Sequence, residues 1–179
     1  MEIHYTVEFF SYWHCGSGLS AGADVDALVV KDKDGLPYIP GKTVKGLIRE
    51  AVEEVAHYRK SEIDTSRIFG FCDDADNRRQ GEAFFSNAEL PENDRNKILK
   101  GELSEYLFTS LSNTSIGEDG IAKDHSLRKT EVTLPCILEG KILNVPEDCA
   151  KIITDSFGYI KRLGVDRNRG LGRCCFSVK

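Results

Sequence analysis

The sequence predicts an α+β fold with the element order strand, helix, strand, strand, helix, strand. Alternating apolar and polar residues indicate strands, and apolar residues that recur every three or four positions indicate helices. The expected elements, in chain order, are a strand over 3–13, a helix over 43–59, strands over 83–88 and 130–143, a helix over 146–164 and a strand over 172–178. This is the order of the ferredoxin-like (RRM-like) βαββαβ core.

The first expected strand is defined by period-two alternation. Ile3 and Val7 fall on one face, His4 and Glu8 fall on the other, and the pattern continues to Trp13. Glycines and turn residues then interrupt it, which indicates a loop before the first helix.

The first expected helix follows a Pro-Gly pair. Thr43 is the expected N-cap, and the helix should end near Arg59. Its apolar face, spaced as one side of a helix, consists of Val44, Leu47, Ile48, Ala51, Val52 and Val55.

The middle of the chain is less regular. The segment 83–88 has strand character, and 93–109 mixes charged residues with leucines in a pattern that favours a short helix. Residues 113–129 contain few large apolar side chains and indicate a loop, and a loop this long inside a domain is usually functional. Residues 130–143 recover strand character, although Pro135 predicts an edge position or a bulge.

The second expected helix begins at Pro146 and ends at Gly164. Its apolar face consists of Cys149, Ile152, Ile153, Phe157, Ile160 and Leu163. A glycine-rich loop then precedes the last strand, which is expected from Gly172 to Val178.

Length and composition predict one domain over 1–179. The chain has 179 residues, of which 40% are hydrophobic and 30% charged, enough for one core. It contains no run of 18 apolar residues and no signal-peptide pattern, so we expect no membrane partner. The six cysteines form no CxxC pair, which favours reduced thiols and a cytoplasmic protein.

The net charge of −5 argues against nucleic-acid binding through the overall charge, so any such site must be a local basic patch. The segment 157–179 holds six basic residues and one acidic residue. Its glycines allow backbone N–H groups to face a phosphate. Arginines this dense favour nucleic-acid binding over a plain glycine-rich turn, and the expected nucleic-acid contacts are Arg167, Arg169, Gly170, Gly172 and Arg173.

A second basic group lies at the start of the first helix. Lys42, Lys45 and Arg49 fall in its first turns, where free backbone N–H groups already favour anions. We expect these three side chains to bind phosphate groups, and the alternative is that they are solvated charges on an amphipathic helix. Gly46 costs about 1 kcal/mol relative to alanine inside a helix, which favours a close approach there.

No residue pattern predicts a metal-binding motif of a known type. Asp73, Asp74 and Asp76 lie beside Arg78 and Arg79 but lack the glycine and the terminal glutamate of a calcium loop. The histidines and cysteines have no zinc spacing. A solvated loop is the preferred interpretation of this segment.

Several blocks together resemble the RAMP superfamily of CRISPR-associated proteins, and within it the backbone subunits of type III effector complexes. The blocks are Gly18 with Gly22, Asp26 to Asp32, the run Gly35-Leu-Pro-Tyr-Ile-Pro-Gly41, Lys45-Gly46-x-x-Arg49, Ile68-Phe69-Gly70 and Arg169-Gly170-Leu-Gly172. They follow the family's order from the first strand to the last. The resemblance therefore covers nearly the whole chain.

The resemblance implies a guide-RNA-binding subunit that stacks in several copies along the RNA with other CRISPR effector subunits and pairs with target RNA in antiviral defence. A thumb-like insertion is expected over about 110–131. In this family an aspartate after the first strand is required for target-RNA cleavage, and by position it is Asp26. The implied activity is that of an endoribonuclease that needs a divalent cation, Mg²⁺ or Mn²⁺, within the assembled complex.

Alternatives remain open on the residues alone. Asp26 is also interpretable as a solvated loop aspartate, and Asp24 is the nearest competing carboxylate. His14 is a weaker catalytic candidate, since a lone histidine is more often a packing residue. The rival functions are a binding-only RAMP subunit and a stand-alone RAMP endoribonuclease that matures guide RNA, with His14 as acid or base.

Overall fold

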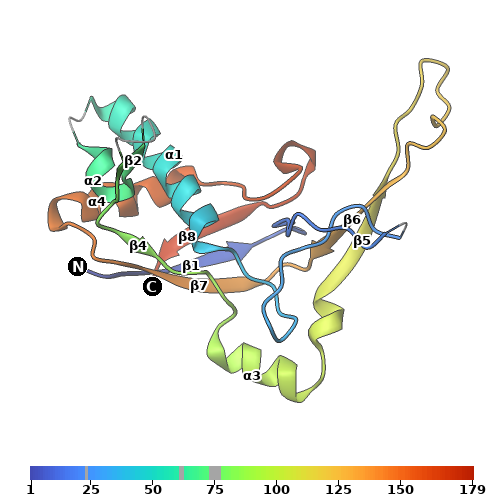
Figure 1. The fold of residues 1–179 in the computed structure, drawn as a ribbon, viewed down its shortest axis with the longest axis horizontal. Coiled ribbons are helices and arrows are strands. Elements are labelled where there is room, and N and C mark those ends of the chain that lie inside the picture. The colour runs from blue at the N-terminus through green and yellow to red at the C-terminus, as the bar shows by residue number, and fades with distance from the viewer. Residues whose placement is uncertain (23, 61–62, 73–77) are drawn as a thin grey trace.

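The structure, a computed structural model, describes residues 1–22, 24–60, 63–72 and 78–179. Two layers form its body: a sheet, and the helices that cover one face of that sheet (Figure 1). Within the described residues the sheet has the order β4-β7-β1-β8, and all neighbouring strands are antiparallel. Its strands are β1 (Ile3–Phe9), β4 (Phe84–Phe85), β7 (Ile137–Leu143) and β8 (Cys174–Val178).

The helices that cover the sheet connect its strands, with α1 between β1 and β4 and α4 between β7 and β8. The α-helices are α1 (Gly41–Arg59), α2 (Thr65–Phe69), α3 (Glu92–Lys100) and α4 (Glu147–Ser156). Short 3₁₀ turns follow at Ser104–Leu107, Phe157–Tyr159 and Arg167–Arg169. The two long elements α1 and α4 contact each other above the sheet.

The core lies between the sheet and these two helices. Apolar side chains that alternate along β1 meet the apolar faces of the helices, and residues such as Val7, Ile48 and Ile153 are completely buried. The ring of Tyr5 stacks on Phe176 at 5.8 Å between centroids. Removing this apolar area from water is the main term that stabilises the fold.

In the described part of the chain, two further strand pairs lie outside the main sheet. The strands β5 (Phe108–Asn113) and β6 (Arg128–Thr133) form a hairpin that projects away from the body (Figure 1). The strands β2 (Phe71–Cys72) and β3 (Arg78–Arg79) form a short pair after α2.

The first strand ends at Phe9, so its expected extension to Trp13 was wrong. Trp13 leaves the sheet to exchange two backbone hydrogen bonds with Thr133 of β6, at 3.1 and 2.8 Å. Its indole returns to stack on Phe9, with 4.4 Å between ring centroids. Apolar and polar residues alternate through Trp13 because both β1 and the residues after it have a buried side. However, β1 pairs with β7 and β8, whereas Trp13 pairs with β6.

The first helix begins at Gly41 rather than at the expected N-cap Thr43. The N–H of Gly41 donates to the side-chain oxygen of Asn87 at 2.9 Å, so the cap comes from a residue 46 positions along the chain. A Cβ at Gly41 would collide with the Phe85 carbonyl. A cap supplied from elsewhere in the fold cannot be found by a local search.

The segment between β4 and β7 also differs from expectation. The helix expected over 93–109 is α3, which ends at Lys100, and the chain becomes strand β5 from Phe108. The loop expected over 113–129 is confirmed over 114–127, which joins β5 to β6 at the outer end of the hairpin, and its end residues belong to the two strands. Exposed strands of this hairpin lack a buried face along most of their length, so their apolar alternation is weak.

Three other expected boundaries were wrong. The strand over 130–143 is two strands in different sheets, because the chain breaks at Pro135, which lacks an N–H for a ladder. The strand over 83–88 contains only Phe84 and Phe85. The second helix ends at Ser156 and not at Gly164, because the following segment pairs with the glycine-rich loop, where the Leu163 N–H donates to Gly172.

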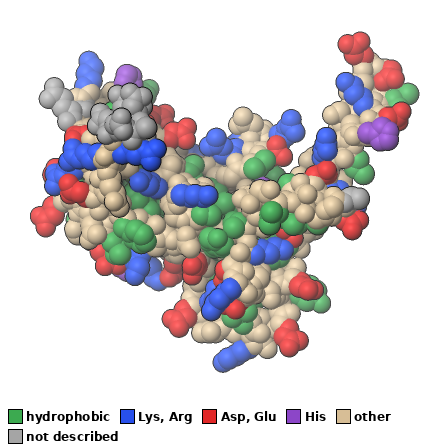
Figure 2. All heavy atoms as spheres, in the orientation of Figure 1, with side chains coloured by type: hydrophobic (Ala, Val, Ile, Leu, Met, Phe, Trp, Pro, Cys, Tyr) green, Lys and Arg blue, Asp and Glu red, His purple; other side chains and the backbone are tan. Residues whose placement is uncertain are grey.

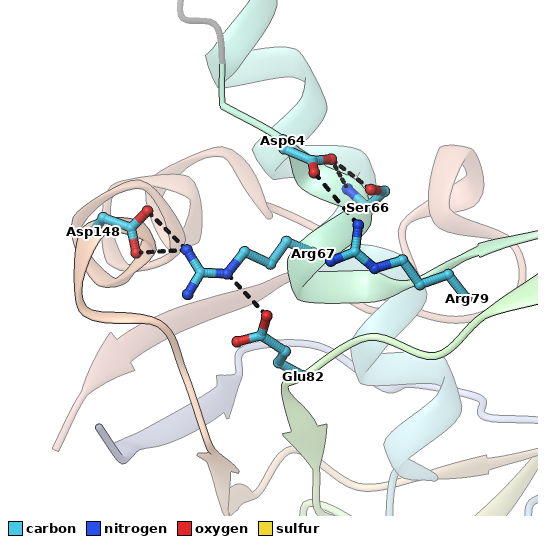
Figure 3. Close-up of polar contacts among 6 residues, drawn as sticks. All are labelled: Asp64, Ser66, Arg67, Arg79, Glu82 and Asp148. Atoms are coloured by element: carbon cyan, nitrogen blue, oxygen red, sulfur yellow. Dashed lines mark hydrogen bonds and ion pairs between the residues drawn. The ribbon is translucent and has the colours of Figure 1, made fainter.

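A cluster of ion pairs links α2 to the rest of the body (Figure 3). Arg67 of α2 binds Glu82 at 2.9 Å and Asp148 of α4 at 3.3 Å. Asp64 accepts hydrogen bonds from the backbone and side chain of Ser66. These side chains are well exposed, so the cluster orients α2 more than it stabilises the fold.

The cysteines whose side chains are described are free thiols. Burial raises the pKa of Cys136 to about 11 and that of Cys174 to about 12. Such thiols are unreactive at neutral pH and act as small apolar residues.

Candidate functional site

The loop that carries Asp26 lies along the base of the β5–β6 hairpin. The Asp26 N–H donates to the Lys129 carbonyl at 2.8 Å, and the Glu131 N–H donates to the Ala27 carbonyl at 3.0 Å. These bonds place the loop beside β6 as an additional, parallel edge segment (Figure 1). The loop therefore has a defined position although it contains little secondary structure of its own.

The Asp26 carboxylate is also tied to β6. Oδ2 accepts the Lys129 N–H at 2.8 Å, and Oδ1 lies 3.3 Å from a guanidinium nitrogen of Arg128. The hydrogen bond from Lys129, followed by the contact with Arg128, holds the pKa of Asp26 below its usual range. An ionised carboxylate is therefore available at neutral pH.

His14 lines the same pocket as Asp26. The pocket has a volume of about 360 Å³ and is lined by His14, Gly16, Gly18, Leu19, Ser20, Asp26, Ala27 and Leu28. His14 is only 2% exposed, and its Nδ1 lies 2.6 Å from the Glu131 carbonyl oxygen. A carbonyl can only accept, so Nδ1 carries the proton and a neutral ring leaves Nε2 as an acceptor.

Asp24 occupies a different position from Asp26. It is exposed, and its backbone N–H donates to Ala21 at 3.2 Å. Among the described residues that line the His14 pocket, Asp26 is the carboxylate and Asp24 is absent. The structure therefore separates the two candidates that lie two positions apart in the sequence.

The glycine-rich loop before β8 packs against the segment that leads to His14. The Val165 N–H donates to the His14 carbonyl at 3.0 Å, and the Gly172 N–H donates to Tyr12 at 2.7 Å. A Cβ at Gly164 would collide with the His14 carbonyl. These glycines are required because two backbones approach closely there.

The arginines of this loop point to solvent. Arg167, Arg169 and Arg173 are exposed. Arg169 lies 3.8 Å from Asp166, and the Arg173 guanidinium lies 6.0 Å from the centre of the Phe10 ring. Exposed guanidinium groups beside close-packed glycines can bind phosphates without disturbing the core.

The basic residues of α1 do not share one environment. Lys42 is exposed and lines a pocket of about 740 Å³ near β4 and β7, whereas Lys45 lines a separate cleft of about 450 Å³ with Arg49, Arg78 and Arg79. Arg49 donates two hydrogen bonds, to the carbonyl oxygens of Phe69 and Gly70, at 2.7 and 2.9 Å. Its guanidinium serves the fold, and its contact with RNA stays a prediction.

The two expected basic groups also remain apart. Arg167 lines a pocket of about 270 Å³ with Glu50 and Glu54, on the acidic side of α1. On the face shown in Figure 2, several Lys and Arg side chains gather at the upper left, and elsewhere Lys and Arg lie interspersed with Asp and Glu. The basic side chains on this face therefore form local groups.

The expectations about metals and membranes can be compared with the described residues only. Within 1–22, 24–60, 63–72 and 78–179 no group of three or more His, Cys, Asp and Glu side chains is placed to hold a metal ion. Asp73, Asp74 and Asp76 lie outside the described residues. Over the same part of the chain, no helix has the length and apolar character needed to cross a membrane.

Sequence reasoning missed the residues of β6 that surround the candidate site. Glu131 places its backbone carbonyl on His14 and its carboxylate on the Val29 N–H, at 2.9 Å, and Arg128 pairs with Asp26. The sequence held one indication that Glu131 has a special role, because it is a charged residue directly before the apolar Val132 in a segment with strand character. Without the partner strand, that signal does not say which residue the carboxylate binds.

Comparison with known proteins assigns the chain to a family. The model of the RAMP superfamily matches residues 6–175. The chain belongs to the RAMP superfamily.

Solved structures share this fold. A chain of the cryo-EM structure of Type III-B Cmr-beta bound to cognate target RNA has a TM-score of 0.74 and 12% identity, over 99% of this chain and 97% of that chain. A chain of Type III-B Cmr-beta in the apo state has a TM-score of 0.73 and 13% identity, over the same shares. Comparison with curated proteins finds none that matches.

Proposed function

We propose that this chain is a guide-RNA-binding backbone subunit of a type III CRISPR effector complex and that it cleaves bound target RNA at Asp26. The observation that carries the proposal is the pocket shared by Asp26 and His14, on a loop fixed to a projecting hairpin. Family membership and the fold shared with chains of Type III-B Cmr-beta support the proposal that this chain is a subunit of such a complex. We expect the protein to act in the cytoplasm in antiviral defence.

The proposal includes a ferredoxin-like core with a thumb, and a set of basic residues that contact the guide RNA. The strand order β4-β7-β1-β8, with one helix in each crossover, supports a ferredoxin-like core, and the β5–β6 hairpin supports a thumb over about 110–131. Guide RNA would contact the exposed arginines beside Gly170 and Gly172, together with Lys42 and Lys45. These groups bind phosphates without reading sequence, as a subunit that accepts any guide requires.

The proposed chemistry needs an ionised carboxylate at the RNA. The donor set in the pocket is a single carboxylate, which fits Mg²⁺ or Mn²⁺ because such ions often take one or two carboxylates together with substrate phosphates and water. The bound cation would neutralise charge on the phosphate. Asp26 would hold it or accept a hydrogen bond from the ribose 2′-hydroxyl. The 2′-oxygen would then attack the adjacent phosphorus while its proton passes to the Asp26 carboxylate or to water. The bond from phosphorus to the 5′ oxygen would break as the 5′ oxygen takes a proton from water, which leaves a 2′,3′-cyclic phosphate and a 5′-hydroxyl.

A second candidate is favoured by the tautomer of His14. Because Nδ1 donates to Glu131, Nε2 is free to accept the proton of a 2′-hydroxyl in the pocket. This geometry supports a stand-alone RAMP endoribonuclease that matures guide RNA without metal. A binding-only subunit is the third alternative, in which Asp26 serves only to fix its loop to β6.

A cleavage assay on the reconstituted complex, with and without EDTA, distinguishes these functions. Asp26→Ala should abolish target cleavage, which should need a divalent cation, and should leave guide and target binding unchanged, whereas the matched control Asp24→Ala should retain cleavage. His14→Asn keeps a donor for Glu131 but lacks Nε2. Cleavage that survives EDTA and is lost in His14→Asn would favour the second candidate. Normal cleavage by Asp26→Ala would reject the assignment of Asp26.

A further inference from the structure

We propose that Glu131 is a positioning residue that fixes the loop from His14 to Lys31 onto the β5–β6 hairpin, so that the hairpin base and the Asp26 loop form one unit. The inference rests on the proposed function, because it concerns the same site. It adds a residue that touches neither RNA nor the reacting atoms and acts through the loop.

Glu131 binds the loop through both its backbone and its side chain. Its N–H donates to Ala27 at 3.0 Å, and its carbonyl lies 2.6 Å from Nδ1 of His14. Its carboxylate accepts the Val29 N–H at 2.9 Å and the Lys31 ammonium at 2.8 Å. One residue of β6 therefore contacts the loop on both sides of Asp26.

The carboxylate of Glu131 is largely removed from solvent, with 14% of its side chain exposed. Val29 is 3% exposed, so its N–H needs a partner within the protein. A charged acceptor forms stronger hydrogen bonds than a neutral one, and here it binds a backbone donor and an ammonium together. Loss of this side chain leaves the Val29 N–H without its acceptor.

Lys31 extends the connection to the other strand of the hairpin. Its ammonium lies 3.9 Å from the centre of the Phe108 ring, and Phe108 is the first residue of β5. Phe108 in turn pairs with Thr133 of β6. The Glu131–Lys31 pair therefore binds the loop to both strands, at the end of the hairpin that joins the body (Figure 1).

This arrangement predicts that the Asp26 loop loses its position when Glu131 is replaced. Misplacement of a reacting group by about 1 Å is enough to cost about 100-fold in rate. Binding of guide and target through the exposed basic residues should be unaffected, because those residues lie on other elements. The effect should therefore fall on the cleavage rate and not on RNA affinity.

The experiment compares Glu131→Ala, Glu131→Gln and the control Glu139→Ala, which removes a comparable glutamate–lysine pair, with Lys179 at 2.7 Å, from β7. Amide hydrogen exchange is measured on the chain, and single-turnover cleavage and target affinity on the complex with guide RNA. Glu131→Ala should speed exchange at Val29 and its neighbours and lower the cleavage rate by about 100-fold at unchanged affinity. Glu131→Gln, whose amide oxygen still accepts the Val29 N–H, should recover part of the amide protection and part of the cleavage rate. Glu139→Ala should match the wild type in both measurements.

Two results would overturn the proposal. Wild-type protection of the Val29 amide in Glu131→Ala would mean that the carboxylate does not fix the loop. Faster exchange throughout β5 and β6, with no recovery in Glu131→Gln, would mean that Glu131 stabilises the whole hairpin and positions nothing in particular. Normal cleavage by Asp26→Ala rejects the proposed chemistry instead, and the exchange of the loop amides still decides the role of Glu131.

Discussion

Gly170 and Gly172 both have a positive φ angle, at 92° and 68°, but different surroundings. A Cβ at Gly170 would enter open space, whereas one at Gly172 would overlap the Leu163 carbonyl. Only Gly172 is therefore required by a close approach of two backbones.

This difference predicts unequal costs for two matched substitutions. Gly170→Ala should lose about 1–3 kcal/mol of unfolding free energy from backbone strain. Gly172→Ala should lose more, since the Leu163 backbone must also move, and the displacement should reach the His14 segment. Urea denaturation measures both, and equal losses would contradict the assigned contact.

The ionisation of Asp26 provides a second residue-scale prediction. Its folded-state pKa lies below the unfolded value, so its contribution to stability is present above the unfolded pKa and is lost as the pH falls through the folded pKa. Arg128→Ala should raise the pKa but leave it below the usual range, because the Lys129 N–H remains, and Lys123→Ala on the same hairpin should not change it. An NMR titration of the Asp26 carboxyl measures this shift, and no response to Arg128→Ala would contradict the ion pair.

At the scale of elements, burial and not ion pairing holds the helices on the sheet. Ile153 of α4 is completely buried, whereas the Arg67 side chain, which joins α2 to α4, is 41% exposed (Figure 3). Water screens the exposed pairs and competes for them. The apolar contacts of Ile153 have no such competition.

Ile153→Ala should therefore destabilise the protein far more than Arg67→Ala. The buried substitution should cost about 2–5 kcal/mol through lost transfer energy and a cavity. Arg67→Ala should produce only a small decrease in the denaturation midpoint. Guanidinium unfolding curves of the two variants measure the difference, and a larger loss for Arg67→Ala would reverse this ranking.

At the scale of the whole molecule, a net charge of −5 must be reconciled with the proposed binding to RNA. Phosphate contacts by exposed cations release counterions, so affinity for single-stranded RNA should fall as salt rises, with a slope of about −0.7 per phosphate contact. Reversing both Arg167 and Arg169 to Glu should weaken binding and reduce that slope.

The control variant replaces Lys97 and Lys100 on α3, which are also exposed, with Glu. It changes the net charge by the same amount as the reversal of Arg167 and Arg169. Fluorescence anisotropy over a salt series measures affinity and slope. An equal loss in both double variants would show that only the overall charge matters, and the glycine-rich loop would then not be an RNA contact.

Assembly is the second prediction at this scale. Copies that bind successive stretches of one RNA meet through different surfaces, and such a contact repeats without closing into a ring. The mass of the protein–RNA complex, measured by light scattering, should therefore increase with RNA length. A single copy on every RNA tested would exclude stacking by this chain alone.

The sequence by itself determined the elements that have a buried face. Periodic apolar residues located α1, α4 and β1, because burial of one face leaves a regular pattern in the chain. It also placed Asp26 in a loop and an unusual density of arginines before the last strand. Where a segment has little buried area, as in β5, the same approach did not find the strand.

Only the tertiary structure decided how the site is assembled. It brought His14 and Asp26 into one pocket, separated Asp24 from them, and placed Arg49 on the carbonyl groups of Phe69 and Gly70. The contact between His14 and Glu131 joins residues 117 positions apart. Such contacts depend on which strands become neighbours, and periodicity cannot encode them because it records only whether each residue is buried.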